Sequence, residues 1–317
     1  MTEIIENAID AQLVKSIEGI PFVCLFSILC FGQKLIGLKR DGPETCLNYD
    51  HPSGSSSLKC SAGFKFETLN DTNFHTVAIY GNHYYDSDKL NKLSAKNFIL
   101  KDLKLDSSQE WEKSGTKFEV REMRQSLTLM DVKLSSYTNR LHFYHIYIER
   151  SDLSTVGSIS AANLPPKLRT LSLVSCLIKD LPLGIFSHTK SLEMLTITRN
   201  SLTSFKPSFF SKFGLVSLWS LDLSFNKIDH IHEDFVVYFP NLAEINLQSN
   251  HLQILPEQPF LRKWIDIDIV NLDANALICE KLLWSTGFKP HPIFFDSAEC
   301  NLEDFSQISL GSLSRIK

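Results

Sequence analysis

The sequence predicts an α/β solenoid, in which short parallel strands stack side by side and each strand is followed by a return segment of loops and brief helical turns. Two observations carry this prediction. A leucine pattern that ends in asparagine recurs, and its final positions are separated by 24, 26, 24 and 25 residues. Phenylalanines recur in the same register, at residues 186, 210, 235 and 260. A constant period of this length is typical of a repeat protein in which each coil adds one strand to a common sheet.

The pattern is Leu-x-x-Leu-x-Leu-x-x-Asn, with Ile or Val replacing Leu at some positions. It occupies residues 168–176, 192–200, 218–226, 242–250 and 267–275. Alternating apolar positions place every second side chain of a strand on the buried face. One coil cannot bury that face alone, so the coils must stack. The Asn at the end of each pattern can satisfy backbone groups of the turn, and Cys176, in the first repeat, replaces it less well.

The four phenylalanines lie about ten residues after the ends of their patterns. We expect one aromatic ring per coil on the return side, where the rings stack on one another and fill the interior.

Toward the N-terminus the pattern continues in weaker form. Three segments fit it and a fourth fits in part: Phe74, Val77, Ile79 with Asn82; Leu100, Leu103, Leu105 with Ser108; Phe143, Ile146, Ile148 with Ser151; and, in part, Leu127, Leu129 with Val132. The step from Val132 to Ser151 is only 19 residues, so that coil is either short or misassigned. We therefore expect about nine strands between residues 74 and 275.

Composition excludes several classes of function. The 32 Lys and Arg nearly balance the 36 Asp and Glu, and no basic stripe suggests nucleic acid. No Gly-rich phosphate loop, HExxH, GxSxG or CxxC motif is present. Two histidine pairs, 142 with 145 and 230 with 232, lack companion ligands at suitable spacing. We expect no enzyme activity, no metal and no cofactor.

The cysteines predict one disulfide at each end of the repeats. Cys46 and Cys60 lie before the first coil, and Cys279 and Cys300 follow the last. Each pair would close a short loop and contribute about 3 kcal/mol in chain-entropy models. Four free thiols are the alternative. The pairing divides the chain into an N-terminal cap over 33–73, repeats over 74–275, and a C-terminal cap and tail over 276–317.

The N-terminal segment predicts secretion. The apolar run 20–31 suits a signal-peptide core, which gives a signal peptide over 1–32 and cleavage before Gln33. The acidic leader (Glu3, Glu6, Asp10, Glu18) is atypical, and an incorrect start or an uncleaved anchor would explain it. No apolar tail follows Cys300, so no membrane span is visible after the signal segment. The sequence Asn70-Asp71-Thr72 is a glycosylation acceptor motif.

These residues resemble the extracellular leucine-rich repeat proteins, of the Toll-like receptor, Slit-like and small leucine-rich ectodomain type. The resemblance covers residues 46–300 and is strongest where 181–186 is followed by 192–200. It implies a curved leucine-rich repeat solenoid with a parallel sheet on the concave face. The segment 275–284, closed by Cys300, is similar to the family's C-terminal cap. However, Ala276 replaces the usual Pro, and two cysteines stand where the cap usually has four.

The family implies protein recognition outside the cell, on the concave face. Two clusters of outward positions are candidates there, because Tyr, Trp and Arg often carry interface energy. The first is Tyr144, His145, Tyr147, Arg150 and Arg169; the second is Trp219 and Phe225, with Asp222 between them and Arg199 beside them. Cross-strand packing of the aromatics is the alternative.

The sequence thus predicts a secreted, non-catalytic recognition module with a protein ligand or receptor as its partner, and homodimerisation is possible. One alternative is an ectodomain fragment of a Toll-like membrane receptor. Another is a cytosolic adaptor with the same repeats, which would have no signal and no paired cysteines. Neither reading names a ligand.

Overall fold

The computed structural model describes residues 46–50, 56–60, 74–80, 84–86, 95–101, 104–106, 124–134, 143–154, 164–257, 260, 266–287, 293, 295, 297–302 and 307–315. Internal contacts divide the chain into two units, Met1–Lys39 and Arg40–Lys317. The expected signal segment, its cleavage before Gln33 and the Asn70 acceptor all lie outside the described residues, so these three stay predictions.

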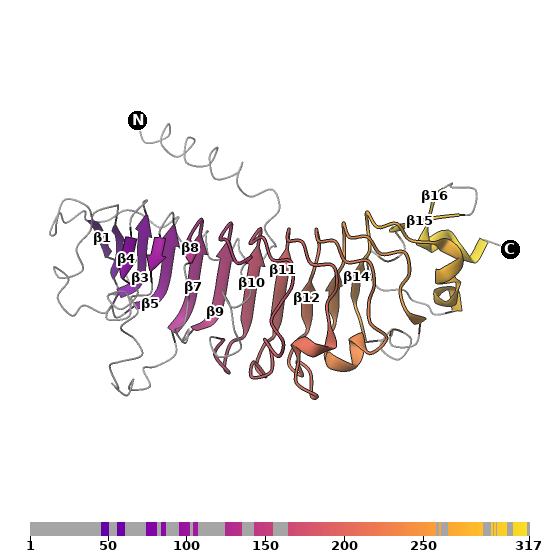
Figure 1. Ribbon diagram of the computed structural model, residues 1–317, viewed down its shortest axis with the longest axis horizontal. Helices are drawn as coiled ribbons and strands as arrows, with labels where there is room; N and C mark the ends of the chain where they lie inside the picture. The colour runs from indigo at the N-terminus through magenta and orange to yellow at the C-terminus, as the bar shows by residue number, and fades with distance from the viewer. Residues whose placement is uncertain are drawn as a thin grey trace. The chain divides into compact units, whose positions relative to one another are not determined.

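The second unit is built on one sheet of eleven strands, which follow one another in chain order (Figure 1). The strands are β1 (Cys46–Asp50), β2 (Ser56–Cys60), β3 (Phe74–Tyr80), β5 (Ala95–Lys101), β7 (Arg124–Met130), β9 (Phe143–Glu149), β10 (Thr170–Val174), β11 (Met194–Thr198), β12 (Ser220–Asp222), β13 (Glu244–Asn246) and β14 (Ile269–Asn271). Strand β1 is antiparallel to β2, and every later neighbouring pair is parallel. This arrangement confirms the predicted α/β solenoid.

The return segments differ between the two halves of the sheet. In the C-terminal half they contain 3-10 turns, η3 (Pro207–Phe209) and η4 (Phe235–Tyr238), as the sequence predicts. In the N-terminal half a second parallel sheet forms instead, from β4 (Tyr84–Asp86), β6 (Lys104–Asp106) and β8 (Lys133–Leu134). The expectation of loops and short helical turns throughout is therefore wrong for these coils.

The second sheet explains an error in register. The sequence pattern placed Leu103 and Leu105 in the main sheet, but Leu105 lies in β6 and pairs with Tyr85 of β4. The true partner of Val77 in the main sheet is Phe98. Two apolar runs, 98–100 and 103–105, follow one another closely, and alternation alone could not distinguish them.

The short coil between β7 and β9 is genuine. Leu127 pairs with Ile146 and Leu129 with Ile148, in the register of the other strands. The backbone N–H of Val132 donates to the Ser151 hydroxyl at 3.1 Å, and that hydroxyl donates to the Glu149 carbonyl. Ser151 thus makes two of the contacts that Asn makes in later coils: it accepts from an N–H of the preceding coil and donates to a carbonyl of its own turn.

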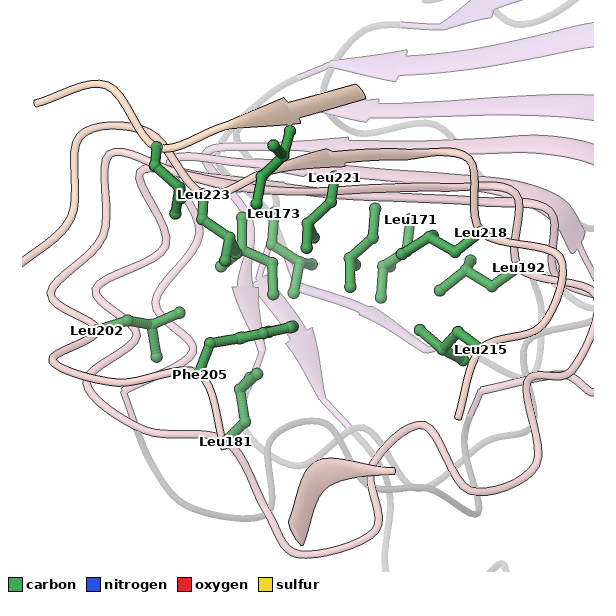
Figure 2. Packing of buried hydrophobic residues seen from close by; sticks show 14 of the residues in the cluster. Leu171, Leu173, Leu181, Leu192, Leu202, Phe205, Leu215, Leu218, Leu221 and Leu223 are labelled. Carbon is green, nitrogen blue, oxygen red and sulfur yellow. The ribbon is translucent and has the colours of Figure 1, made fainter. Parts of the chain in front are cut away.

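Leucines of the strands fill the interior, as the pattern predicts. Leu171, Leu173, Leu221 and Leu223 are each at most 1% exposed. Figure 2 shows them in rows that point the same way, toward Phe205 and other apolar side chains of the return segments. Each strand therefore depends on the coils on both sides of it for its burial, which makes stability roughly a sum over neighbours.

The asparagines form a continuous ladder between coils. The Asn200 side chain accepts from the backbone N–H of Ile178 at 3.1 Å and donates to the Leu173 carbonyl at 2.9 Å, both one coil back. Asn226, Asn250 and Asn275 repeat this pattern. The ladder confirms that the recurring Asn of these four coils satisfies buried backbone groups.

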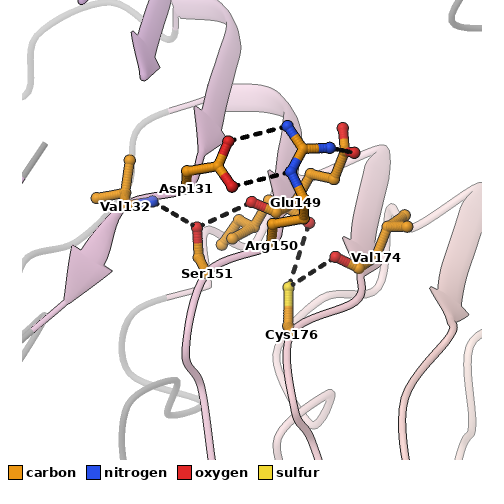
Figure 3. Close-up of polar contacts among 8 residues, drawn as sticks. Asp131, Val132, Glu149, Arg150, Ser151, Val174 and Cys176 are labelled. Carbon is orange, nitrogen blue, oxygen red and sulfur yellow. Dashed lines mark hydrogen bonds and ion pairs between the residues drawn. The ribbon is translucent and has the colours of Figure 1, made fainter. Parts of the chain in front are cut away.

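Cys176 fills the first of these ladder positions as a buried free thiol. Its Sγ lies 3.4 Å from the Ile148 carbonyl oxygen and 3.3 Å from that of Val174, so the thiol donates where Asn would donate (Figure 3). Burial raises the pKa of the thiol to about 12, because the thiolate would lose its hydration.

The phenylalanine register is confirmed in part. Phe186 stacks on Phe210, with ring centroids 5.7 Å apart, and Phe235 stacks on Phe260 at 6.3 Å. No direct contact joins the two pairs among the described aromatic contacts. Phe205 and Phe239 bridge them, because each contacts both Phe210 and Phe235. The interior thus contains a second set of rings that the 25-residue register did not reveal.

Further elements cover the C-terminal end of the sheet. Ile293 pairs with the outer edge of β14, and beyond it lie η5 (Cys279–Gly287), the hairpin of β15 (Glu299–Asn301) with β16 (Gln307–Ser309), and η6 (Leu310–Arg315). A disulfide joins Cys279 to Cys300, whose Cα atoms are 5.1 Å apart. This separation is typical of a disulfide.

At the other end, Cys60 is disulfide-bonded and lies opposite Cys46 in the β1/β2 pair. The side chain of Cys46 lies outside the described residues, so the Cys46–Cys60 pairing stays a prediction that this register favours.

Candidate functional site

A row of left-handed residues runs along the edge where the strands end. The residue before each ladder position has φ between 48° and 55° in seven successive coils: Asp131, Arg150, Ser175, Arg199, Phe225, Ser249 and Ala274. In most of these coils its N–H donates to a carbonyl of the next coil, such as Phe225 to Gln248 at 2.8 Å. We call this set the left-handed row.

Arg199 and Phe225 are neighbours in the left-handed row. The guanidinium carbon of Arg199 lies 4.5 Å from the centre of the Phe225 ring, within the range of a cation–π contact. Both residues are exposed, Phe225 to 39%. An exposed ring under a guanidinium offers a partner an apolar surface and a positive charge at one place.

Arg150, two coils before Arg199 in the left-handed row, forms ion pairs with two acidic residues. Its Nε and Nη2 donate to the two carboxylate oxygens of Asp131 at 2.8 and 2.9 Å, and its Nη1 pairs with Glu149 (Figure 3). The charge of Arg150 is therefore compensated within the protein. The structure places it away from Tyr144 of the same predicted cluster, at the opposite end of strand β9.

A second row follows the edge where the strands begin. It contains Tyr144, Arg169, Glu193 and Trp219, one from each of four adjacent coils, and each N–H donates to the carbonyl of the one before. Arg169 lies over the Tyr144 ring at 5.8 Å, and its Nε is 3.7 Å from Glu193. Trp219 is 38% exposed. We call this set the strand-start row.

His145 and Tyr147 lie between the two rows, on strand β9. The His145 ring nitrogen Nδ1 is 3.0 Å from the Thr170 hydroxyl on the next strand. Burial lowers the pKa of His145, the Arg169 charge lowers it further, and Glu193 acts in the opposite direction. Tyr147 is opposite Ser172 and is half-buried. Both residues pack against the sheet more than the sequence suggested.

Asp222 is directed into its own turn. Its carboxylate accepts a hydrogen bond from the Ser224 backbone N–H at 2.9 Å. Burial raises the pKa of this carboxyl group, while hydrogen bonds from Ser224 and the Asn246 side chain oppose the rise. The equivalent residues of the next two coils, Asn246 and Asn271, make the same turn contact.

The structure does not bring Trp219 and Phe225 together. The sequence placed both on outward strand positions, but β12 contains only Ser220–Asp222, and they flank it at opposite ends. They are six positions apart along the chain. Of the predicted site residues, three lie in each row and three in neither: Tyr144, Arg169 and Trp219 are in the strand-start row, Arg150, Arg199 and Phe225 are in the left-handed row, and His145, Tyr147 and Asp222 are outside both. Binding at these residues stays a prediction.

Sequence reasoning gave Glu193 no place in either candidate cluster and missed an exposed apolar group on the return side. Glu193 joins the strand-start row because it follows Leu192 as Arg169 follows Leu168. Phe213, 62% exposed, has Lys212 and Lys190 within 4.9 and 6.0 Å of its ring centre. No period marks Phe213, so only its neighbouring lysines could have drawn attention to it.

Within the described part of the chain, no group of three His, Cys, Asp or Glu side chains is arranged to bind a metal ion. Likewise, none of the described helices combines the length and apolar character needed to span a bilayer.

Comparison with known proteins agrees with the fold. A leucine rich repeat family model matches residues 166–228. The chain is similar to keratocan from Danio rerio, with 26% identity over 43% of this chain, and spans 37% of that protein. It is also similar to the probable serine/threonine-protein kinase pats1 from Dictyostelium discoideum, with 26% identity over 52% of this chain but only 6% of the kinase. The chain therefore contains leucine-rich repeats, and its described strands stack as the solenoid that such repeats build.

Proposed function

We propose that this protein is an extracellular, non-catalytic recognition module whose protein partner binds across the strand face between the left-handed row and the strand-start row. One observation carries the proposal: two large aromatic side chains, Trp219 and Phe225, stay more than a third exposed at the two ends of strand β12, while every described apolar side chain on the strands of the main sheet is buried or half-buried. Exposed aromatics beside charged side chains are typical of interface hot spots.

The separation of these aromatics shapes the proposal. Trp219 and Phe225 lie at opposite edges of the same coil, so they act as two anchors rather than one. A partner that contacts both must extend across the whole width of the sheet. Arg169 and Glu193 would surround the first anchor, and Arg199 would lie beside the second.

Support for an extracellular location comes from the cysteines. The disulfide between Cys279 and Cys300, and the disulfide-bonded state of Cys60, suit an oxidising compartment. The similarity to keratocan and the resemblance to extracellular leucine-rich repeat proteins point the same way. Support for a non-catalytic role comes from the repeat match, because such solenoids generally present binding surfaces.

Secretion can be tested in cell culture. The full chain should appear in the medium, and its migration in a denaturing gel should change with reductant. A protein that stays in the cell with all its cysteines free would contradict the extracellular proposal and favour the cytosolic adaptor.

The binding surface can be tested with an array of extracellular proteins. A partner found with the full chain should bind at least about fivefold more weakly to Trp219→Ala and to Phe225→Ala, each losing about 1 kcal/mol or more. Phe213→Ala is the matched control, because it removes an exposed aromatic from the return side. Unchanged affinity of both variants would reject the surface, and a lowered melting temperature would show that the aromatics are structural.

A further inference from the structure

We infer that Arg199, stacked on Phe225, receives a carboxylate group of the protein partner. This inference rests on the proposed function and names the chemistry that the second anchor recognises. The carboxylate can come from an Asp or Glu side chain or from the partner's C-terminus, and the experiment below separates these sources.

The backbone of Arg199 and Phe225 is strained. Arg199 and Phe225 have φ near 55°, a conformation that costs large L-residues about 1–2 kcal/mol. The coils on either side place Ser175 and Ser249 in the same conformation, so the turn itself needs no large side chain. Strained residues with large exposed side chains are a reason to look for a function.

The positive charge of Arg199 differs from that of the neighbouring arginines in having no acidic partner among residues 164–257. Arg150 is paired with Asp131 and Glu149, and Arg169 with Glu193. From residue 164 to 257 the structure describes every residue, apart from the side chain at 236. Within that stretch no acid pairs with Arg199, and no side chain or carbonyl accepts a hydrogen bond from its guanidinium. Arg199 therefore differs from Arg150 and Arg169, because no acidic side chain between residues 164 and 257 compensates its charge.

The Phe225 ring orients the Arg199 guanidinium. The Phe225 ring contacts the guanidinium at 4.5 Å and restricts its motion, which lowers the entropy lost on binding. A planar guanidinium can donate two parallel hydrogen bonds to a carboxylate, which a lysine cannot do. Stacking occupies a face of the guanidinium, whereas these hydrogen bonds lie in its plane.

Partly exposed uncharged residues lie beside Arg199 and Phe225: Ser175 and Ser249 are their neighbours in the left-handed row, and the Gln248 carbonyl accepts from the Phe225 N–H. The carboxylate of Asp222, three residues before Phe225, is directed into its own turn, where it accepts from the Ser224 N–H. The uncharged side chains add no negative charge that would repel a carboxylate. The hydroxyl groups of Ser175 and Ser249 and the amide of Gln248 suit the polar rim that surrounds an anchor at an interface.

The experiment uses the full chain and a displayed library of random twelve-residue peptides. One arm presents each peptide internally, and the other presents it with a free C-terminal carboxylate. Peptides retained by the wild type but lost on Phe225→Ala report this site. We expect them to be enriched in Asp and Glu in the internal arm if side chains bind, or to depend on the free terminus in the other arm.

Variants then measure the contact. The best peptide should lose at least about tenfold in affinity on Arg199→Gln, and Arg199→Lys should recover only part of it. Replacing the peptide's Glu or Asp by its amide, or amidating its terminus, should cause the same loss but no further loss on Arg199→Gln. Lys227→Gln is the matched control, because it removes an exposed positive charge two residues after Phe225.

The outcomes separate the two proposals. Peptides that depend on Phe225 or Trp219 but show neither acid enrichment nor dependence on Arg199 would overturn the inference and leave the proposed surface intact. An equal loss on Lys227→Gln would reduce the effect to net charge and would also overturn it. Peptides indifferent to Trp219, Phe225 and Arg199, or no peptides at all, would count against both.

Discussion

The Nδ2 atom of Asn226 donates to the carbonyl oxygen of Ile197, one coil back, at 2.7 Å. Its Oδ1 accepts from the N–H of Leu202 in the same preceding coil. One buried side chain thus satisfies a donor and an acceptor of its neighbour, and it also bonds the carbonyls of Leu223 and Ser224 in its own turn. The ladder therefore joins coils as well as completing turns.

Asn226→Ala should lower the free energy of unfolding by about 1–3 kcal/mol, because it leaves buried backbone groups without partners. Asn241→Ala is the control. Asn241 also donates to a carbonyl of the preceding coil, that of Val216 at 2.6 Å, but it is exposed, and water can replace the bond. Denaturant unfolding of both variants checks this, and equal losses would show that burial does not set the cost.

Gly214→Ala should be clearly more destabilising than Gly184→Ala. Both glycines have φ +65°, so both variants carry the same backbone strain. A Cβ at Gly214 would lie 2.1 Å from the Tyr238 carbonyl oxygen, whereas at Gly184 the nearest atom is 3.7 Å away, on Ser187. The steric contact should add about 1–3 kcal/mol to the loss at Gly214. Similar melting temperatures for the two variants would mean that the Tyr238 backbone moves to accommodate the methyl group with no loss of stability.

Asp222→Asn should raise stability at neutral pH. Burial raises the pKa of this carboxyl group, so the charged form is disfavoured in the folded state. Asn246 and Asn271 make the same turn with an amide, which shows that the site accepts one. Because wild-type Asp222 gains stability as pH falls through its raised pKa, the advantage of Asn should shrink in acid. Melting temperatures at pH 7 and pH 4 measure this, and an advantage that grows toward pH 4 contradicts it.

Cys176→Ser should change how stability responds to alkali. The folded thiol has a pKa of about 12, while an unfolded thiol ionises near pH 9. The folded state therefore holds a proton that the unfolded state releases, and the wild type loses stability as pH rises from about 9 toward 12. By pH 10 the wild type should have lost about 1 kcal/mol relative to the serine variant. Ser151 already serves as a ladder residue, which makes serine a fair replacement. A pH-independent difference would show that the thiol ionises normally.

Periodicity revealed those parts of the fold that repeat. The strand positions of Leu171, Leu195, Leu221 and Ile245 follow from a constant period, and the structure pairs them in that register. The period does not predict the coil near Leu103, because the strands there are irregularly spaced, with 21 residues from Val77 to Phe98 and 29 from Phe98 to Leu127. An alternating apolar run does not indicate whether its strand joins the main sheet or the second sheet of β4, β6 and β8.

The candidate site was predictable by residue type but not by position. Residue type points to Trp219, Phe225 and Arg199, because such residues often form interfaces, and all three are exposed. Sequence does not show that strand β12 is only three residues long, which places Trp219 and Phe225 at opposite ends of it. Strand length depends on hydrogen bonds with neighbouring coils, which the sequence of one coil does not contain.

The left-handed row places one side chain per coil, and neighbouring strands are about 4.8 Å apart, so alternate members such as Arg150 and Arg199 recur every 9.6 Å or so. A polyproline II segment presents the same face every three residues, or about 9.3 Å. A β-strand presents the same face every two residues, about 6.7 Å, which matches neither one coil nor two. A peptide bound along this edge can therefore place one side chain at every second coil if it is a polyproline II helix. An extended strand cannot, because its repeat does not match the spacing of the coils.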